Sequence, residues 1–291
     1  MLQPATSGRL ERSCGSSSND WIRFAPSRPG LERIEAGFGG YAFDPHRHDT
    51  YAIGYTVNGV QSFDYRGARC DSTKGQVIVL HPDEIHDGRA GATGGFRYRL
   101  LYIEPRLIRN ALGREAGPLP FVRSPVLSNV RLMTALCSVL DDLDHELDEL
   151  ATDGAVLAIA DALRALDSSI AKRPLSATCA TSVERAREFL DAHSARVVAS
   201  AELEAVTGLD RYLLARHFRA MLGTSPHRYL TLRRLDTARS MMRAGHSLAS
   251  SALACGFSDQ SHMTRQFSRA YGLSPSRWRA TWRAATRGPA A

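Results

Sequence analysis

Five residues in two short segments are the best candidates for chemistry in this chain. His46 and His48 are separated by one residue, and His81, Glu84 and His86 follow together in a later segment. Imidazole binds iron, zinc, copper or nickel, and it also forms hydrogen bonds with polar small molecules. Three interpretations of His46, His48 and His86 are open: a three-imidazole metal site, polar groups of a pocket for an organic effector, or hydrogen-bonded structural histidines.

A repeat near the other end of the chain is the second distinctive feature. Residues 216–218 (Arg-His-Phe) are followed by residues 223–229 (Gly-Thr-Ser-Pro-His-Arg-Tyr), and the same pattern recurs 49 residues later, from Arg265 to Trp278. A repeat at fixed spacing marks a duplicated structural unit. Two copies are too few for a solenoid, so the repeat predicts a small module used in tandem.

Each copy predicts a helix, a tight turn and a second helix. In the first copy, Gly208 allows the turn because glycine tolerates positive φ, and Asp210 can cap the next helix. That helix would bury Leu214, Phe218 and Met221, which recur at helical spacing. In the second copy, Ser247 can cap the first helix, Gly256 allows the turn, and Ser258 or Asp259 can cap the next helix. That helix would bury Met263, Phe267 and Ala270.

Positive charge is concentrated on this repeat. Residues 182–291 hold 17 arginines, no lysine and 8 acidic residues, a net charge of +9, whereas the whole chain carries +7. Phosphate contacts from arginine and lysine supply most of the sequence-independent affinity for DNA. Helix–turn–helix units that carry the positive charge favour DNA binding over an ordinary solvated surface.

The segment from Ala254 to Phe267 (Ala-Cys-Gly-Phe-Ser-Asp-Gln-Ser-His-Met-Thr-Arg-Gln-Phe), continued by residues 271–278, resembles the signature of the AraC/XylS family of bacterial transcription regulators. The resemblance covers about residues 182–283. It implies a DNA-binding domain with two helix–turn–helix motifs, held a helical turn of DNA apart by a long helix near Pro226–Arg243. It also implies an operator in double-stranded DNA, and RNA polymerase as a partner.

In helix–turn–helix proteins, the second helix of each motif enters the major groove, and its N-terminal residues reach the base edges. Arginine favours guanine and glutamine favours adenine, although Arg216 and Arg265 could instead bind phosphate or brace their helices. Tyr229 and Trp278 are expected in the core. The expected DNA-contacting residues are Arg211, Tyr212, Ala215, Arg216 and Arg219 on the first recognition helix and Gln260, Ser261, His262, Arg265 and Arg269 on the second.

The N-terminal half has short runs of alternating apolar residues, which predict an all-β barrel or double-sheet roll. The turn signals between these runs are Asn58-Gly59, Arg66-Gly67, Lys74-Gly75 and Gly94-Gly95. The two histidine segments resemble the cupin motifs of the sensor domains of AraC-type regulators, which implies a small-molecule effector. The candidate effector-binding residues are His46, His48, Tyr55, His81, Glu84 and His86, and no cofactor is expected.

Between the two halves, leucines and one methionine from Met133 to Leu150 recur at steps of three and four, the spacing of a coiled coil. They predict either a helix packed on the barrel or a dimer seam. The expected domains are a disordered tail (residues 1–19), a cupin-like sensor (20–118), a helical connector (119–171), a linker (172–181) and a DNA-binding domain (182–288).

The fold class expected is therefore multidomain α+β, with an N-terminal β-barrel or jelly roll and a C-terminal all-α domain. Five scattered cysteines are typical of free thiols in a reducing cytoplasm, and no run reaches the roughly 18 apolar residues of a membrane span. We expect a cytoplasmic, homodimeric, effector-responsive transcription regulator rather than an enzyme. The alternative is a metal-dependent cupin enzyme or a metal sensor, with His46, His48 and His86 as ligands, fused to a DNA-binding module.

Overall fold

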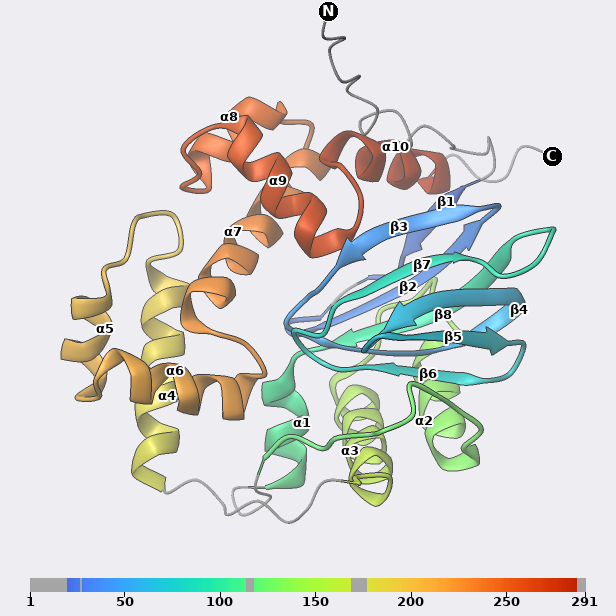
Figure 1. The fold of residues 1–291 in the computed structure, drawn as a ribbon, viewed down its shortest axis with the longest axis horizontal. Helices are drawn as coiled ribbons and strands as arrows, with labels where there is room; N and C mark the ends of the chain where they lie inside the picture. Colours follow the sequence, from blue (N-terminus) through green and yellow to red (C-terminus); the bar gives the residue numbers. More distant parts are fainter. Residues whose placement is uncertain (1–19, 27, 114–117, 169–176, 287–291) are drawn as a thin grey trace, which may run out of the picture.

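The computed structural model describes residues 20–26, 28–113, 118–168 and 177–286. An N-terminal antiparallel sheet lies between a layer of helices, α1 to α3, and a C-terminal half made of helices only (Figure 1). This arrangement confirms the predicted fold class. The tail predicted for residues 1–19 lies outside the described residues. No described helix is both long and apolar enough to cross a membrane.

The sheet has nine strands among the described residues, and all pairings are antiparallel. The strands are β1 (Trp21–Phe24), β2 (Leu31–Phe38), β3 (Tyr41–His46), β4 (Tyr51–Tyr65), β5 (Ala68–Thr73), β6 (Val77–Leu80), β7 (His86–Ala90), β8 (Phe96–Ile103) and β9 (Val126–Leu127). The main path is β1-β2-β8-β4-β6-β9. The long strand β4 also pairs with β5 and β7 through its second half, so the sheet folds over on itself as a roll.

One predicted turn is wrong. Asn58-Gly59 lies within β4, where the register with β8 shifts after Thr56, whereas the other three predicted turns do separate strands. Gly59 has φ 73°, and a Cβ there would lie 2.1 Å from the carbonyl oxygen of Gly95. The glycine therefore serves a bulge and a close strand contact, which have the same residue preference as a turn.

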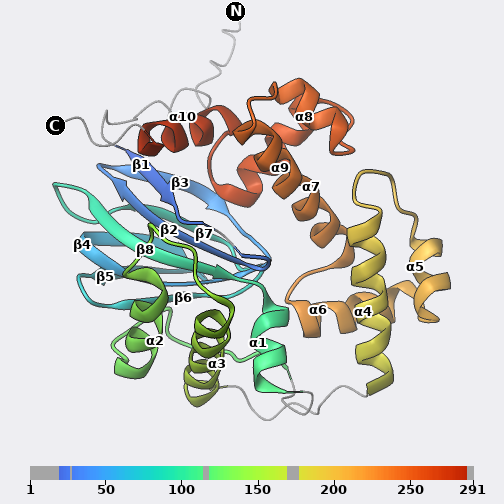
Figure 2. The ribbon, with the colours of Figure 1, turned by 180° about the vertical axis from the view of Figure 1, so that it is seen from behind.

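The connector contains two helices, α2 (Val130–Leu140) and α3 (Glu149–Ala165), which cover the sheet together with α1 (Pro105–Leu112) (Figure 2). The prediction of one continuous helix from Met133 to Leu150 is therefore wrong. Leu136, Leu140 and Leu143 are buried in the core between helices and sheet, and Leu150 is exposed. These buried leucines cannot form a dimer seam.

A buried arginine explains where α2 ends. The Arg33 guanidinium on β2 donates hydrogen bonds to the carbonyl oxygens of Val139, Asp142 and His145, at and just beyond the last turn of α2. Carbonyl groups at a helix end lack partners within the helix, so a guanidinium placed there stabilises the end. Asp148 then caps the start of α3 through the N–H of Ala151. These polar contacts interrupt a leucine pattern that alone would continue.

The C-terminal half begins at α4 (Ala177–Ala192), five residues earlier than predicted. Of the linker predicted for residues 172–181, residues 177–181 are helical, and residues 172–176 lie outside the described residues. The remaining helices are α5 (Ser200–Thr207), α6 (Arg211–Leu222), α7 (Pro226–Arg243), α8 (Leu248–Ala254), α9 (Gln260–Tyr271) and α10 (Pro275–Thr286).

Both helix–turn–helix units are formed as predicted. Asp210 caps α6 by accepting hydrogen bonds from two backbone N–H groups of the first turn, and Asp259 caps α9 by accepting one from the N–H of His262. Gly208 and Gly256, at the two turns, have φ near 70–78°. The predicted core residues Leu214, Phe218, Met221, Met263, Phe267 and Ala270 are buried, as are Tyr229 and Trp278.

Candidate functional site

The structure brings His46, His48 and His86 together. Each offers one ring nitrogen, and these atoms all lie within 4.8 Å of one another in a buried cluster. The Nδ1 atoms are occupied by backbone carbonyl oxygens, those of Asp44 for His46 at 2.8 Å, Thr50 for His48 at 2.9 Å and Glu84 for His86 at 3.0 Å. The Nε2 atoms are therefore the ones left for a ligand, and Nε2 of His48 is buried without a hydrogen bond.

The surroundings of these three histidines favour the neutral form of each ring. Burial lowers the pKa of His46 and His48 well below its ordinary value, and the neighbouring imidazoles lower it further. Burial also lowers the pKa of His86, to about 4. A neutral imidazole whose Nδ1–H donates to a carbonyl presents a lone pair at Nε2. The cluster can accept hydrogen bonds from an effector or bind a metal ion.

The other three candidate effector residues lie elsewhere. The hydroxyl of Tyr55 donates to Asp141, on the helix-covered face of the sheet, and Glu84 forms a partly exposed ion pair with Arg66. His81 is a core residue whose two ring nitrogens bond to the Tyr65 hydroxyl and to the Val122 N–H, each at 3.0 Å. For Tyr55 the cause is simple, because odd-numbered residues at the start of β4 face the helices rather than the cluster. His81 and Glu84 are held away from the cluster by the partners just named.

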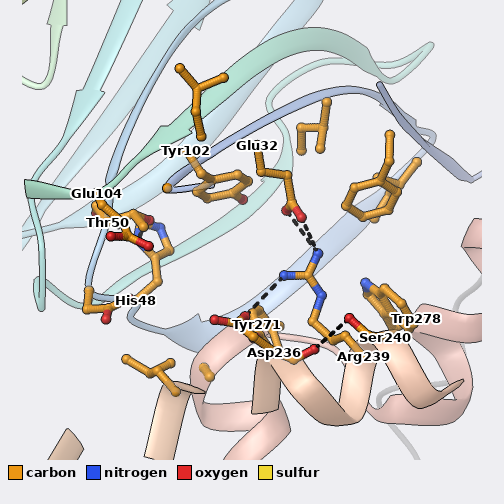
Figure 3. Close-up of a pocket in the computed structure, with 18 of the residues that line it drawn as sticks. Glu32, His48, Thr50, Tyr102, Glu104, Asp236, Arg239, Ser240, Tyr271 and Trp278 are labelled. Carbon is orange, nitrogen blue, oxygen red and sulfur yellow. Dashed lines mark hydrogen bonds and ion pairs between the residues drawn. The ribbon is translucent and has the colours of Figure 1, made fainter. Parts of the chain in front are cut away.

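A cavity of about 340 Å³ lies beside the histidine cluster, between the sheet and helices α7, α9 and α10 (Figure 3). His46 and His48 line it from the sheet side, together with Glu32 and Tyr102. The residues contributed by the helical half include Arg233, Asp236, Arg239, Arg243, Tyr271 and Trp278. Both halves of the molecule therefore form its walls.

Arg239 is the main polar contact across this cavity. Its guanidinium donates two hydrogen bonds to the Glu32 carboxylate, at 2.7 and 2.9 Å (Figure 3). The rings of Tyr271 and Trp278 lie 4.9 and 5.4 Å from it, close enough for cation–π attraction. A buried ion pair with this many partners fixes α7 to β2.

A second set of ion pairs lies near the middle of α7. Arg233 contacts Asp49 at 3.0 Å and Glu104 at 3.2 Å, both from the sensor half. Burial raises the pKa of Asp49 to about 6, although the nearby Arg233 opposes this shift. Much of the positive charge of α7 is therefore neutralised by the sensor half rather than left free for DNA.

The arginines of α7 that face the sensor half were not predicted as site residues, although one signal was present. Arg239 and Arg243, which line the cavity, and Arg228, which lies outside it, are spaced by 4 and 11 residues, so they share one face of a helix. A helix that only holds two DNA-reading motifs apart has no need of such a face. The alignment of these arginines indicated a charged partner, and the folded structure supplies it.

The expected base-reading residues are accessible. Arg211, Tyr212, Arg216, Gln260, Ser261 and Arg265 are exposed on α6 and α9, whereas Ala215 and His262 are half-buried. Arg211 stacks on Tyr212 and forms an exposed ion pair with Glu204 at 3.8 Å. Arg219 and Arg269 differ from the rest, because both lie toward the C-terminal ends of their helices, beside the sensor half. Base contact by these residues stays a prediction.

Comparisons with known proteins agree with this architecture. A family model described as the AraC-like ligand binding domain matches residues 28–160, and a helix-turn-helix domain model matches residues 203–281. The chain belongs to the AraC family of transcription regulators. This family member is a DNA-binding transcription regulator with an N-terminal ligand-binding domain.

Two curated relatives match most of this regulator. It is 27% identical over 228 residues to the uncharacterized HTH-type transcriptional regulator YbfI of Bacillus subtilis, covering 76% of this chain and 81% of that protein. It is 24% identical over 264 residues to the HTH-type transcriptional activator RhaS of Escherichia coli, covering 87% of this chain and 94% of that protein.

Solved structures of ToxT from Vibrio cholerae have the same fold as this regulator. One matches with a TM-score of 0.62 at 12% identity, over 87% of this chain and 98% of that chain. Another, of wild-type ToxT with a bound unsaturated fatty acid, matches with a TM-score of 0.60 at 14% identity, over 91% of this chain and 96% of that chain.

Proposed function

We propose that a small organic effector occupies the cavity between the two halves and thereby changes the affinity of this regulator for DNA. The observation that carries the proposal is the shared wall, because Glu32 and Tyr102 come from the sensor half and Arg239 and Tyr271 come from the DNA-binding half. A ligand that contacts both halves favours the arrangement in which both contacts are made. The fatty acid bound to ToxT, a protein of the same fold, supports an organic ligand.

The walls of the cavity indicate the type of molecule. Ile22, Phe24, Ile34 and Leu273 form an apolar surface, and polar groups gather on the remainder. Arg243 approaches Glu32 only to 4.0 Å, and its Nε has no hydrogen bond, so its guanidinium can donate to an acceptor on the effector. We therefore propose an effector with an apolar body and at least one hydrogen-bond acceptor or acidic group.

A thermal-unfolding screen of the full chain tests this part. A ligand at about 100 times its Kd stabilises the folded protein by about 2.7 kcal/mol. Medium-chain and long-chain carboxylic acids, aromatic acids and neutral alcohols of matched size form the screening set. The hit should lose its effect in the cavity variant Leu273→Trp but keep it in Leu253→Ala, since Leu253 is exposed and does not line the cavity. Stabilisation that survives Leu273→Trp would place the ligand elsewhere.

We also propose that α6 and α9 read bases, with Arg216, Gln260 and Arg265 as the main readers. Their exposed positions in the first two turns of capped helices support this role. Arg265→Ala should lower affinity for a selected operator by ~1–3 kcal/mol and relax the preference at one base pair. Equal loss of affinity for every sequence would make Arg265 a phosphate contact instead. Selection from a random duplex library supplies the operator.

Three further properties belong to the same proposal: a homodimer on paired half-sites, contact with RNA polymerase, and action on chromosomal DNA in the bacterial cytoplasm. They are expected from the resemblance to AraC/XylS regulators. The leucines of α2 are not the dimer surface, so any dimer must use another face. Sedimentation of the full chain with and without operator DNA tests the oligomeric state.

Metal sensing is a second candidate, favoured by one specific observation. The three imidazoles converge with their Nδ1 atoms already bonded, and the buried Nε2 of His48 lacks a partner, as suits a borderline metal ion. His46, His48 and His86 would hold the ion, which would supply a Lewis-acidic centre. Metal content after purification without chelators, compared between the parent and His48→Ala, tests this candidate. Absence of stoichiometric metal from the parent would leave the organic effector as the sole proposal.

A further inference from the structure

Asp83 is the centre of an arginine cluster at the junction of the two halves. Its carboxylate lies 2.9 Å from Arg228, 3.1 Å from Arg219 and 3.6 Å from Arg47. The side chain is only 5% exposed, and the backbone has φ 62°, which is uncommon for a residue other than glycine. One buried carboxylate, held in a strained conformation, thus neutralises part of the charge of three arginines.

The cluster opens into a pocket of about 480 Å³ with an excess of positive charge. The pocket lies between the ends of α6 and α9, the start of α7 and the sensor loops, and its lining includes a fourth arginine, Arg269. Asp83 is the single acidic residue in that lining. Four guanidinium groups around one carboxylate leave a net charge suited to a further anion.

The position of this pocket relative to the recognition helices indicates which anion. Arg219 is four residues beyond Ala215 on α6, and Arg269 is four residues beyond Arg265 on α9, so each arginine continues the face that carries the expected base readers. When two helices enter successive segments of the major groove, a helical turn apart, the phosphate backbones that border the intervening minor groove pass between them. The pocket lies between these two helices on that side.

We infer that Arg47, Arg219 and Arg228 form a binding site for a DNA backbone phosphate, and that Asp83 occupies this site in the present structure in place of the phosphate. Two consequences follow. Arg47 belongs to the sensor half, so the ligand-binding domain contributes directly to DNA contact. Asp83 competes with DNA, so the loop that carries it lowers DNA affinity until it withdraws. This inference goes beyond the proposed function, which concerns the effector cavity and base reading.

The test uses the full chain and a fluorescein-labelled duplex of mixed sequence, with anisotropy titrations over a range of KCl concentrations. Asp83→Asn removes the competing charge, and asparagine tolerates positive φ, so the loop keeps its conformation. We expect DNA affinity to rise about fivefold or more. The slope of log affinity against log salt should steepen by ~0.9 for each additional DNA phosphate that the arginines neutralise.

The matched control is Glu84→Gln, which removes a neighbouring charge in the same loop, where it pairs within the sensor half with Arg66 at 3.0 Å. It should leave affinity and slope unchanged. Combined with Asp83→Asn, Arg47→Ala should lower the gained affinity and reduce the slope by about one, whereas alone, with Asp83 still in the site, it should leave the slope unchanged. Should Asp83→Asn fail to fold, Asp83→Gly replaces it, because glycine also adopts positive φ.

Three results would overturn the inference. The first is an unchanged affinity and salt slope in Asp83→Asn. The second is an equal increase in affinity in Glu84→Gln. The third concerns a free anion. If inorganic phosphate raises the unfolding temperature of Asp83→Asn more than chloride does at equal ionic strength, while DNA binding matches the parent, the pocket takes a small anion and not the DNA backbone.

Discussion

Gly272, which ends recognition helix α9, lies directly against His46 of the histidine cluster. A Cβ on Gly272 would be 2.7 Å from Nδ1 of His46 and 2.8 Å from the carbonyl oxygen of Asp44. The backbone N–H of Asp44 donates to the carbonyl oxygen of Gly272 at 3.0 Å. The second recognition helix therefore ends on the strand that carries the cluster, and a movement of either one displaces the other.

This contact predicts a large effect of Gly272→Ala. The variant carries the strain of an alanine at φ 66° and also a clash with β3, so it should lower the thermal unfolding temperature and loosen the junction. Gly208→Ala is a matched control, since Gly208 also follows a helix at φ 70° but a Cβ there would meet nothing within 4 Å. The control should lower the free energy of unfolding by about 1 kcal/mol, and Gly272→Ala should lower it by clearly more. Equal losses of stability in the two variants would show that β3 moves away from the added methyl group at no measurable cost.

Stability should decrease in acid because of His81. Its Nε2 accepts the Val122 N–H, which requires the neutral ring, and burial lowers its pKa from 6.5 to about 3. The unfolded chain therefore binds a proton below pH 6.5 that the folded protein does not. The contribution of neutral His81 to the free energy of unfolding is fully present above pH 6.5. It is lost as the pH falls toward 3, by up to ~1.4 kcal/mol per pH unit.

Urea unfolding at several pH values between neutrality and pH 4 checks this prediction. In His81→Gln the amide does not titrate, so the free energy of unfolding should be lower at neutral pH and should depend less on pH than in the parent. Exposed His145 is the control position, because its pKa is raised by Asp142 and His145→Gln should not flatten the acid limb. An acid limb of the same slope in His81→Gln would contradict the assignment.

Removing the Glu32 carboxylate should weaken the contact between the two halves more than removing a surface carboxylate does. Glu32→Ala leaves the buried guanidinium of Arg239 without the carboxylate that accepts its hydrogen bonds, which should cost ~3 kcal/mol. Glu146→Ala breaks an exposed pair with Arg28 at 3.7 Å and should cost less than ~1 kcal/mol. Thermal unfolding followed by circular dichroism compares them, and limited proteolysis reports opening at the junction. Equal effects of the two variants would show that the pair of Arg239 and Glu32 is not the main link between the two halves.

Features encoded by neighbouring residues could be predicted from the sequence. The caps at Asp210 and Asp259, the turn glycines and the buried faces of α6 and α9 all depend on contacts within about one helical turn. The long helix near Pro226–Arg243, which the resemblance to AraC/XylS regulators implied, is confirmed with these bounds. The grouping of His46, His48 and His86 was also foreseen, through the resemblance to cupin motifs.

Contacts between distant residues were decided by the tertiary structure. The leucine spacing from Met133 to Leu150 predicted one helix, because a pattern of apolar residues does not show that Arg33, more than 100 positions earlier, ends that helix. Tyr55 lies on the helix-covered face and not beside the histidine cluster, since alternation gives two faces but not which one meets the cluster.

The arginines of the C-terminal half show the same division most clearly. Their number and their placement on helix–turn–helix units determined, by themselves, that this domain suits DNA. Only the folded chain determined that Arg239 binds Glu32 and that Arg219 and Arg228 bind Asp83, residues 136 to 207 positions away. A charge attracts any opposite charge, so its partner is chosen by which surfaces the fold brings together, and not by the residues beside it.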